Sequence, residues 1–205
     1  MRKKQNQQGK AVRSIVRTIL NQSNDRLLKS MKAAAAGNLI DISFGDSFDL
    51  EKEIVCQIEG SFSVDDTKLF YDLLKNAENM SLLTDNAGEI VIDKLLIDEI
   101  QRWRMQNGYK PIRVTSLVKA RPILNDALDA DAQDAGLYTV GEVYDTGCSY
   151  IGTPFEYVSD FTREKLETAD MIIAKGLANF ESLYSQKNLQ KENLLFIQVK
   201  MQLDF

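Results

Sequence analysis

Residues 81–92 read SLLTDNAGEIVI, and this stretch decides the fold. Its first four residues form a short apolar run that a turn signal ends, as in a buried strand. From Glu89 onward, apolar residues recur at helical spacing as far as residue 106. The stretch therefore predicts a strand, a tight turn and a helix. Asp85 and Asn86 are then the polar residues at the end of the strand.

The same order of elements recurs downstream. The predicted pairs are a strand at 110–117 with a helix at 127–134, a strand at 171–174 with a helix at 177–184, and a final strand at 194–199. Alternation at this spacing indicates crossover connections, and hence a largely parallel sheet with helices on both faces. The predicted fold class is α/β, with three layers in the order α/β/α. Because ligands of such sheets bind beyond the carboxyl ends of the strands, the residues after each apolar run are the candidate site residues.

The region before this sheet is predicted to be helical. Apolar residues fall at helical intervals over 10–36, with a break at 21–25. Gly37 is expected to end the second helix as a left-handed cap, and residues 39–44 are expected to begin a loop or a short buried turn.

A further helix is predicted over 65–76, with Asp65 or Asp66 as its N-cap. The change from helical to alternating pattern is soft. We therefore expect a helical portion at 1–78 and an α/β portion at 79–205, packed as one compact unit.

Composition narrows the classes of protein. The chain has 205 residues, 44% of them hydrophobic and 27% charged, which suits one globular core. Its net charge of -5 argues against general binding to nucleic acid or to an anionic membrane. No apolar run approaches about 18 residues and no signal core follows the N-terminus, so we expect a cytoplasmic protein.

The chain has no histidine and only two cysteines, Cys56 and Cys148, which lie far apart. This excludes Ser-His and Cys-His nucleophile pairs and the histidine-containing zinc motifs, and it argues against a disulfide framework. No phosphate-binding glycine loop or dinucleotide fingerprint is present. Catalysis would therefore rest on carboxylates, amides, lysines and a hard cation with oxygen ligands.

The first strand end has two interpretations. The oxygens of Asp85 and Asn86 could hold a cation, while free backbone N–H groups at the start of the helix could meet a phosphate. Alternatively, Asp85 or Asn86 only caps the helix, with Glu89 completing a capping box. This junction alone does not choose between them.

The other strand ends favour a site. Asn125 and Asp126 follow the second run, Lys175 follows the third and Lys200 follows the last. Lysine at a strand end suits the oxygens of a phosphate. Asp126 also fits an N-cap, and the acidic residues of the next helix, Asp129, Asp131 and Asp134, are expected on a solvated face. Four polar strand ends together favour a metal and phosphate site.

Three segments carry a family resemblance: LLTDNAGEIV at 82–91, VKARPILND at 118–126 and ADMIIAKGLANFESL at 169–183. In this order they resemble the damage-control phosphatase family over roughly residues 33–200. The resemblance implies a three-layer α/β/α fold behind a helical N-terminal part. It also implies a divalent cation, namely manganese, nickel, cobalt or magnesium.

The resemblance also implies roles for particular residues. The metal ligands would be Asp85, Asn86 and Asp126. Catalysis would involve Asp85, Asp126 and Lys200, and the substrate phosphate would meet Lys175, Lys200, Asn125 and Asn179. Glu89 and Glu181 would brace the site from behind.

The function implied is hydrolysis of small phosphorylated metabolites, such as sugar phosphates or phosphopantetheine derivatives. A metal-bound water is favoured as nucleophile over Asp85, because a metal ligand is poorly placed to attack. The chain lacks the family's N-terminal Cys-x-x-Cys pair and ends at Phe205, so we expect a form shortened at both ends.

Two alternatives follow. A shortened chain could bind metal or phosphate without turnover. A carboxyl methyltransferase is least favoured, because no glycine-rich adenosyl-cofactor loop follows the first strand. Nothing in the sequence selects the substrate, the metal or the oligomeric state.

Overall fold

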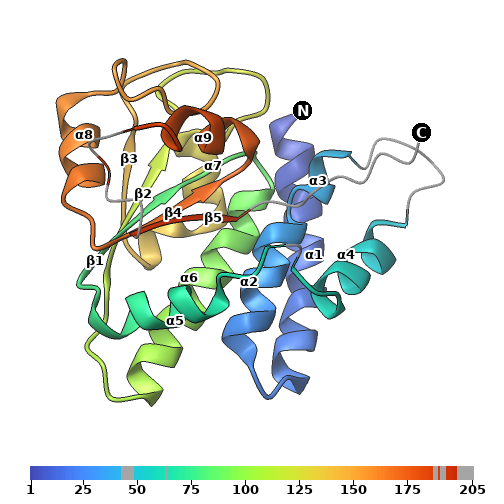
Figure 1. The fold of residues 1–205 in the computed structure, drawn as a ribbon. Coiled ribbons are helices and arrows are strands. Elements are labelled where there is room, and N and C mark those ends of the chain that lie inside the picture. Colours follow the sequence, from blue (N-terminus) through green and yellow to red (C-terminus); the bar gives the residue numbers. More distant parts are fainter. Residues whose placement is uncertain (43–48, 63, 187–188, 190–192, 198–205) are drawn as a thin grey trace.

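The computed structural model describes residues 1–42, 49–62, 64–186, 189 and 193–197. These residues form a parallel sheet with helices on both sides (Figure 1). The strands are β1 (Asn79–Leu83), β2 (Arg113–Val118), β3 (Glu142–Asp145), β4 (Met171–Lys175) and β5 (Leu194–Ile197). The predicted α/β class and the largely parallel sheet are confirmed.

The five strands lie in the order β3-β2-β1-β4-β5, and every neighbouring pair is parallel. The chain therefore runs outward from β1 to β3 and then returns to the other side of β1 to form β4. The direction of winding reverses between β1 and β4. In parallel sheets of this kind, the crevice at the reversal point is where ligands bind.

Helices precede the sheet and cover it. Before β1 lie α1 (Arg2–Gln22), α2 (Arg26–Ala36), α3 (Leu39–Ile42), α4 (Leu50–Glu59) and α5 (Thr67–Asn76). Among the strands lie α6 (Glu89–Gln106), α7 (Asp129–Ala135), the 3-10 turn η1 (Leu137–Thr139), α8 (Asp160–Glu167) and α9 (Leu177–Leu183). None of the described helices is both long and apolar enough to cross a membrane.

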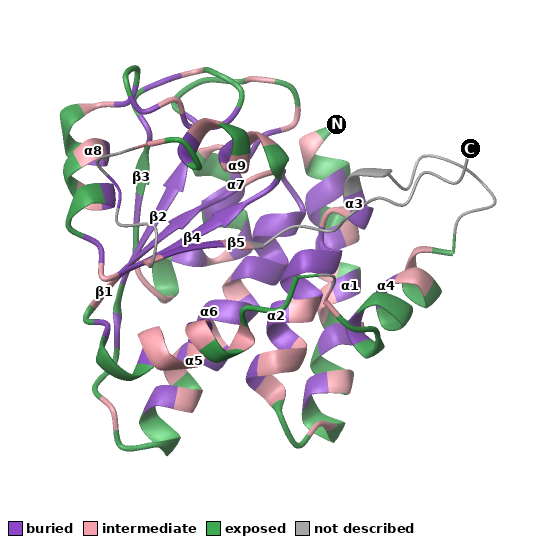
Figure 2. Cartoon of the chain, in the orientation of Figure 1, coloured by how far each residue is buried: buried purple, intermediate pink, exposed green. Residues whose placement is uncertain are grey.

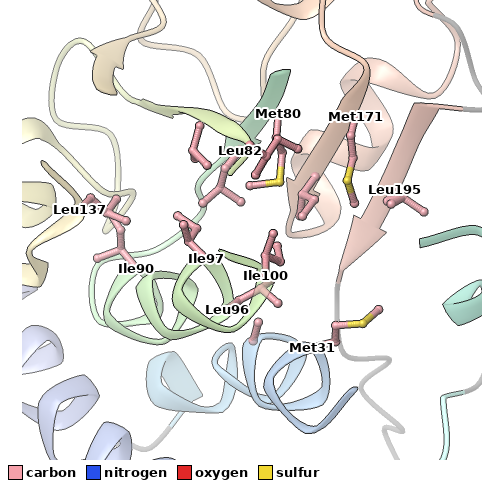
Figure 3. Packing of buried hydrophobic residues seen from close by; sticks show 14 of the residues in the cluster. Met31, Met80, Leu82, Ile90, Leu96, Ile97, Ile100, Leu137, Met171 and Leu195 are labelled. Atoms are coloured by element: carbon pink, nitrogen blue, oxygen red, sulfur yellow. The ribbon is translucent and has the colours of Figure 1, made fainter. Parts of the chain in front are cut away.

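Alternate residues of each strand face opposite layers. In β4, Met171 and Ile173 join the core cluster formed with α6, which Figure 3 shows from close by. Ile172 and Ala174 join a separate cluster that contains Leu183 of α9. By the same alternation Lys175, the last residue of β4, faces α6. This register is what brings a lysine against the helix that follows the first motif.

Helix α6 is buried on almost every side. Ile90, Leu96 and Ile97 pack toward the sheet, whereas Ile92 and Leu95 pack in a second cluster with residues of α1, α2 and α4. Figure 2 shows buried residues along α6 and along the strands. Apolar residues on two sides of α6 therefore place this helix between the sheet and the N-terminal helices. The helices at the N-terminus thus lie against the helix that begins at the first motif.

The predicted left-handed cap at Gly37 is wrong, because Gly37 adopts a right-handed conformation with φ -52° and ψ -32°. Residues 39–42 form the single helical turn α3, in which Leu39 and Ile40 are buried, so of the two alternatives for this segment the short buried turn is the one observed. A Cβ at Gly37 would lie 3.5 Å from Cγ of Glu89, which is ordinary van der Waals contact with α6. Residues 43 and 44 of the predicted turn lie outside the described residues.

Several elements escaped the sequence pattern. Helix α1 begins at Arg2, earlier than the predicted start at residue 10. The prediction missed its first turns because their residues are polar and show no apolar period. Helices α4 and α8 and the edge strand β3 were not predicted, and β3 has only one buried residue, Val143. At α5 the Asp65 carboxylate accepts a hydrogen bond from the Thr67 amide (2.9 Å), whereas the Asp66 side chain makes no cap bond.

Candidate metal and phosphate site

The ends of β1 and β4 meet at the reversal point of the sheet. Asp85 follows β1 and Gly176 follows β4. Gly176 has φ +82°, and a Cβ there would lie 2.0 Å from Oδ2 of Asp85. Only glycine permits both this conformation and this approach. The Asp85 carboxylate therefore lies directly against the backbone at the end of β4.

The segments after β1 and β2 are paired backbone to backbone. Asn86 and Asp126 form an isolated antiparallel bridge. The amide of Ala87 donates to the Asn125 carbonyl (2.9 Å), and the amide that follows Asp126 donates to the Asp85 carbonyl (2.8 Å). The structure thus brings together all three residues predicted as metal ligands, Asp85, Asn86 and Asp126.

Neither aspartate acts as a helix cap. Helix α6 has Gly88 at its N-cap position, with no side-chain cap bond. Helix α7 begins at Asp129, and the carboxylate near its start belongs to Asp131, whose Oδ2 accepts from the Leu128 amide (3.0 Å). The capping alternatives for Asp85 and Asp126 are therefore wrong. The carboxylates of Asp85 and Asp126 are therefore not used to cap these helices.

The Asn86 side chain is held by its nitrogen. Nδ2 donates to Oε1 of Glu89 (2.8 Å) and lies 3.3 Å from Oδ2 of Asp85. An amide held in this way offers its oxygen as the remaining ligand atom. Glu89 is itself buried, so the predicted bracing role of Glu89 has a direct contact in the structure.

Lys175 is enclosed by carboxylates. Its Nζ lies 3.1 Å from Oε2 of Glu89 and 2.9 Å from Oδ1 of Asp93, and its side chain is 1% exposed. Glu89 and Asp93 are four residues apart on α6 and so share one face of the helix. Asp93 was not predicted as a site residue. Its helical spacing from Glu89 is the signal that would have found it.

A second buried lysine lies beside Asp126. Nζ of Lys119 lies 3.6 Å from Oδ2 of Asp126 and also donates to the carbonyl of Gly152. Lys119 follows β2 directly, so the rule of inspecting the residue after each strand would have found it. Lys119 was not among the predicted site residues.

Burial changes the acidity of these groups. It raises the pKa of Asp85 to about 8, with a further rise from the Glu89 charge and an opposing effect of Lys175. It also raises the pKa of Asp93 to about 6 and raises that of Asp126, where Lys119 opposes it. A buried carboxylate resists ionisation unless a positive charge lies near.

Among the described residues, the cluster contains more acids than bases. Four carboxylates, Asp85, Glu89, Asp93 and Asp126, lie with two lysines, Lys119 and Lys175. With all six ionised the balance is two negative charges, which one divalent cation would neutralise. The donor set of two carboxylates and an amide suits such a cation.

Within the described ranges, no three His, Cys, Asp or Glu side chains are grouped closely enough to hold a metal ion by themselves. The candidate ligand set would therefore rely on the Asn86 oxygen, with solvent or substrate oxygens completing the coordination. Such a set would leave coordination positions on the cation open for an oxygen of the substrate.

The other predicted residues fall in different surroundings. Asn179 is buried, and its Nδ2 donates to the carbonyls of Lys175 (2.7 Å) and Thr84 (3.2 Å), while its Oδ1 accepts from the Thr153 hydroxyl (2.7 Å). It therefore braces the ends of β1 and β4. Glu181 is exposed. Lys200 lies outside the described residues.

One prediction about the acidic helix is wrong. Asp129 and Asp134 are exposed as expected, but Asp131 is only 5% exposed. It is buried because three groups surround it: its Oδ1 accepts from Nδ2 of Asn6 (2.8 Å), its Oδ2 accepts from the Leu128 amide, and Arg2 lies 3.4 Å away.

A cavity of about 450 Å³ lies elsewhere, where the chain turns from α1 into α2. Asp25, Arg26, Tyr71 and Trp103 are among its lining residues, and the carboxylates of the reversal point are not. The candidate site is therefore defined by the charged residues at the strand ends and not by this cavity.

Comparison with known proteins identifies the family. A sequence model of the damage-control phosphatase ARMT1-like domain matches residues 1–202. A damage-control phosphatase of Pyrococcus horikoshii is 39% identical over 155 residues, which are 75% of this chain and 52% of the relative. An uncharacterized protein of Methanocaldococcus jannaschii is 37% identical over 162 residues, 78% of this chain and 51% of the relative.

A damage-control phosphatase of Archaeoglobus fulgidus is 31% identical over 183 residues, 87% of this chain and 60% of the relative. The crystal structure of a DUF89 family protein from Pyrococcus horikoshii at 2.04 Å resolution matches with a TM-score of 0.80 and 32% identity, over 96% of this chain and 65% of that one. The chain spans about half the length of the first two relatives. The match over residues 1–202 shows that this chain belongs to the damage-control phosphatase ARMT1-like family.

Proposed function

We propose that this chain is a divalent-metal-dependent phosphatase of small phosphorylated metabolites, with Asp85, Asn86 and Asp126 as the metal ligands. The observation that supports the proposal is the backbone pairing of the two strand-end segments, in which Asn86 is paired with Asp126 and the Asp85 carbonyl accepts from the amide that follows Asp126. The excess of buried carboxylates over lysines supports a cation there.

When bound, the cation would polarise a phosphate oxygen and lower the pKa of a water molecule. Manganese, nickel, cobalt and magnesium are the proposed candidates, and sugar phosphates or phosphopantetheine derivatives are the proposed substrate classes. The named relatives support a phosphatase in general and leave metal and substrate to experiment.

The lysines would supply positive charge for the phosphate. Lys119 lies beside Asp126 with one carboxylate partner at 3.6 Å, so its charge is the less neutralised of the two buried lysines. Lys175 would act from behind Glu89, and Lys200 keeps its proposed contact with the phosphate. Point charges at fixed positions favour the transition state of phosphoryl transfer more than the ground state.

Asp85 is proposed as a ligand and not as the nucleophile. Its Oδ2 lies against Gly176 and within 3.3 Å of Nδ2 of Asn86, so the carboxylate is held in place from two sides. A nucleophile must approach phosphorus in line with the leaving group, and a carboxylate fixed as a metal ligand is poorly placed to do so. Water is therefore the proposed nucleophile.

The test is phosphate release from a panel of sugar phosphates, with each metal in turn and with metal-stripped protein as the baseline. We expect metal-dependent release by the wild type and a loss of about 100-fold or more in Asp126→Asn. Asp129→Asn is the matched control, because Asp129 is an exposed carboxylate three residues further along.

Release that does not depend on metal, or full activity of Asp126→Asn, would overturn the proposal. Metal binding without any release from the panel would instead favour the binding-only alternative. Calorimetric titration with manganese distinguishes these two outcomes.

A further inference from the structure

One side chain of the N-terminal helix connects both candidate metal segments. Asn6 of α1 accepts a hydrogen bond at Oδ1 from the amide of Gly88 (2.8 Å) and donates from Nδ2 to Oδ1 of Asp131 (2.8 Å). Gly88 follows Asn86 by two residues, and Asp131 follows Asp126 by five. The Asn6 side chain is buried, at 4% exposed.

The contact with Gly88 supplies a hydrogen-bond acceptor for an amide of the turn. Gly88 is the N-cap of α6 and has no side chain with which to cap it. Amides at a helix start have no partner within the helix, and a buried one that stays unpaired costs free energy. Asn6 accepts from this amide across 82 positions of the sequence. The turn after Asp85 is therefore fixed from outside, by α1.

Helix α1 touches the same turn a second time. A Cβ at Gly9 would lie 2.3 Å from the carbonyl oxygen of Gly88, so only glycine allows this approach. Asn6 and Gly9 are three residues apart and so share one face of α1. This face of α1 packs directly against the turn, and the hydrogen bond from Asn6 to Asp131 joins the same face to α7.

Asp131, the other partner of Asn6, is in turn hydrogen-bonded to the segment that follows Asp126. Its Oδ2 accepts from the amide of Leu128, two residues after Asp126. Asn6 thus links the turn that carries Asp85 and Asn86, through Asp131 and the Leu128 amide, to the segment that carries Asp126. The backbone bridge between Asn86 and Asp126 lies between these two anchor points.

We infer that Asn6 is a positioning residue for the metal site: it holds the Asp85–Asn86 turn in register with the Asp126 segment. This inference rests on the proposed function for the identity of the bound metal. The link itself can be measured without any metal. Partners of this kind, behind the ligands, typically change metal affinity by about 10- to 100-fold when they are removed.

The test compares Asn6→Ala with Lys10→Ala. Lys10 is the matched control, because it also joins α1 to α7, through Asp134 at 2.5 Å, and this bond does not involve the turn. We expect Asn6→Ala to weaken manganese affinity about 10- to 100-fold and Lys10→Ala to change it less than about 2-fold. Hydrogen exchange on metal-free protein should speed up at residues 84–89 and 125–131 only in Asn6→Ala.

A second pair of variants, which exchanges the amide and the carboxylate between positions 6 and 131, shows whether a loss of affinity comes from this hydrogen bond or from general loss of folding. Asn6→Asp alone should weaken binding most, because it places a second carboxylate beside Asp131. Adding Asp131→Asn restores the hydrogen bond in the opposite direction, with position 131 donating and position 6 accepting, so the double variant should return to within about 3-fold of wild-type affinity.

The inference is overturned if Asn6→Ala keeps wild-type exchange at both segments, or if the double variant is no better than Asn6→Asp. A wild type that binds no manganese would defeat the proposed function alone. The exchange comparison would still decide whether Asn6 holds the two segments together.

Discussion

The segments that follow β1 and β2 contain the same residue types but differ in their charge balance. Around the first lie three carboxylates, Asp85, Glu89 and Asp93, with one lysine, Lys175. In the second, Asp126 lies beside Lys119. The first is therefore short of positive charge and the second is balanced. Two segments with the same residue types therefore differ in task under the proposed function: the first would create the need for a cation, and the second would complete its ligands.

The largest expected effect comes from removing the lysine of the acidic cluster. Lys175→Met leaves three buried carboxylates without a cation, and breaking a buried pair in this way costs about 3–5 kcal/mol. Chemical denaturation of metal-free protein measures this loss. Lys119→Met removes the partner of a single carboxylate, so its cost should be smaller, at about 1–3 kcal/mol. Equal losses in the two variants would contradict the difference in charge balance.

The next largest effect is the pH dependence of the metal-free protein. The folded pKa of Asp85, about 8, lies above its ordinary value of 3.8, so between these values the folded state holds a proton that the unfolded chain has released. Stability is therefore full below pH 4 for this group and falls as pH rises toward 8, by at most about 1.4 kcal/mol per pH unit. Asp93, with a pKa of about 6, adds to the fall in the lower part of this window.

Asp85→Asn should flatten this fall and raise the stability of the metal-free protein near pH 8. Denaturation midpoints at pH 5, 6, 7 and 8 provide the measurement. Asp126→Asn is the comparison, and it should flatten the curve less because Lys119 already balances that carboxylate. A metal-free wild type that becomes more stable between pH 5 and 8 would contradict this assignment.

Metal affinity should follow pH in the opposite direction. Because the cation competes with the proton on Asp85, manganese affinity should rise with pH up to about 8, by at most about tenfold per unit. Calorimetric titrations at pH 6, 7 and 8 measure the slope. An affinity that does not change over this range would show that Asp85 is not a ligand.

The smallest effect is expected at Glu181, which is exposed. Glu181→Gln should change the free energy of unfolding by less than about 0.5 kcal/mol, because substitutions at exposed positions seldom do more. It should also leave manganese affinity unchanged. A marked loss of affinity in this variant would restore the bracing role that the resemblance implied.

Sequence reasoning located the first strand, the turn and helix α6, whose predicted and observed ends coincide at residues 89 and 106. It succeeded there because a strand period, a turn and a helix period follow one another without interruption. It also predicted that Asp126 lies near this turn, although β2 ends at Val118 and Asp126 reaches the turn through the bridge to Asn86. Parallel strands bring their carboxyl ends to one edge, so local pattern was enough to predict that these residues meet.

The rest depended on contacts between distant positions. Asn6 and Asp131 are 125 residues apart, and no local pattern joins a polar residue of α1 to an acidic one of α7. The burial of Asp131 follows from that contact, which is why a solvated face was the wrong expectation. The charge balance likewise required the register of β4, because only the alternation of its residues turns Lys175 toward Glu89.

The most direct test is a calorimetric manganese titration of wild type, Asp85→Asn, Asp126→Asn and Asp129→Asn at one pH. We predict one site in the wild type and in Asp129→Asn, and a loss of affinity of about 100-fold or more in each of the other two variants. Unchanged affinity in Asp85→Asn and Asp126→Asn would show that the two strand-end segments do not form a shared metal site.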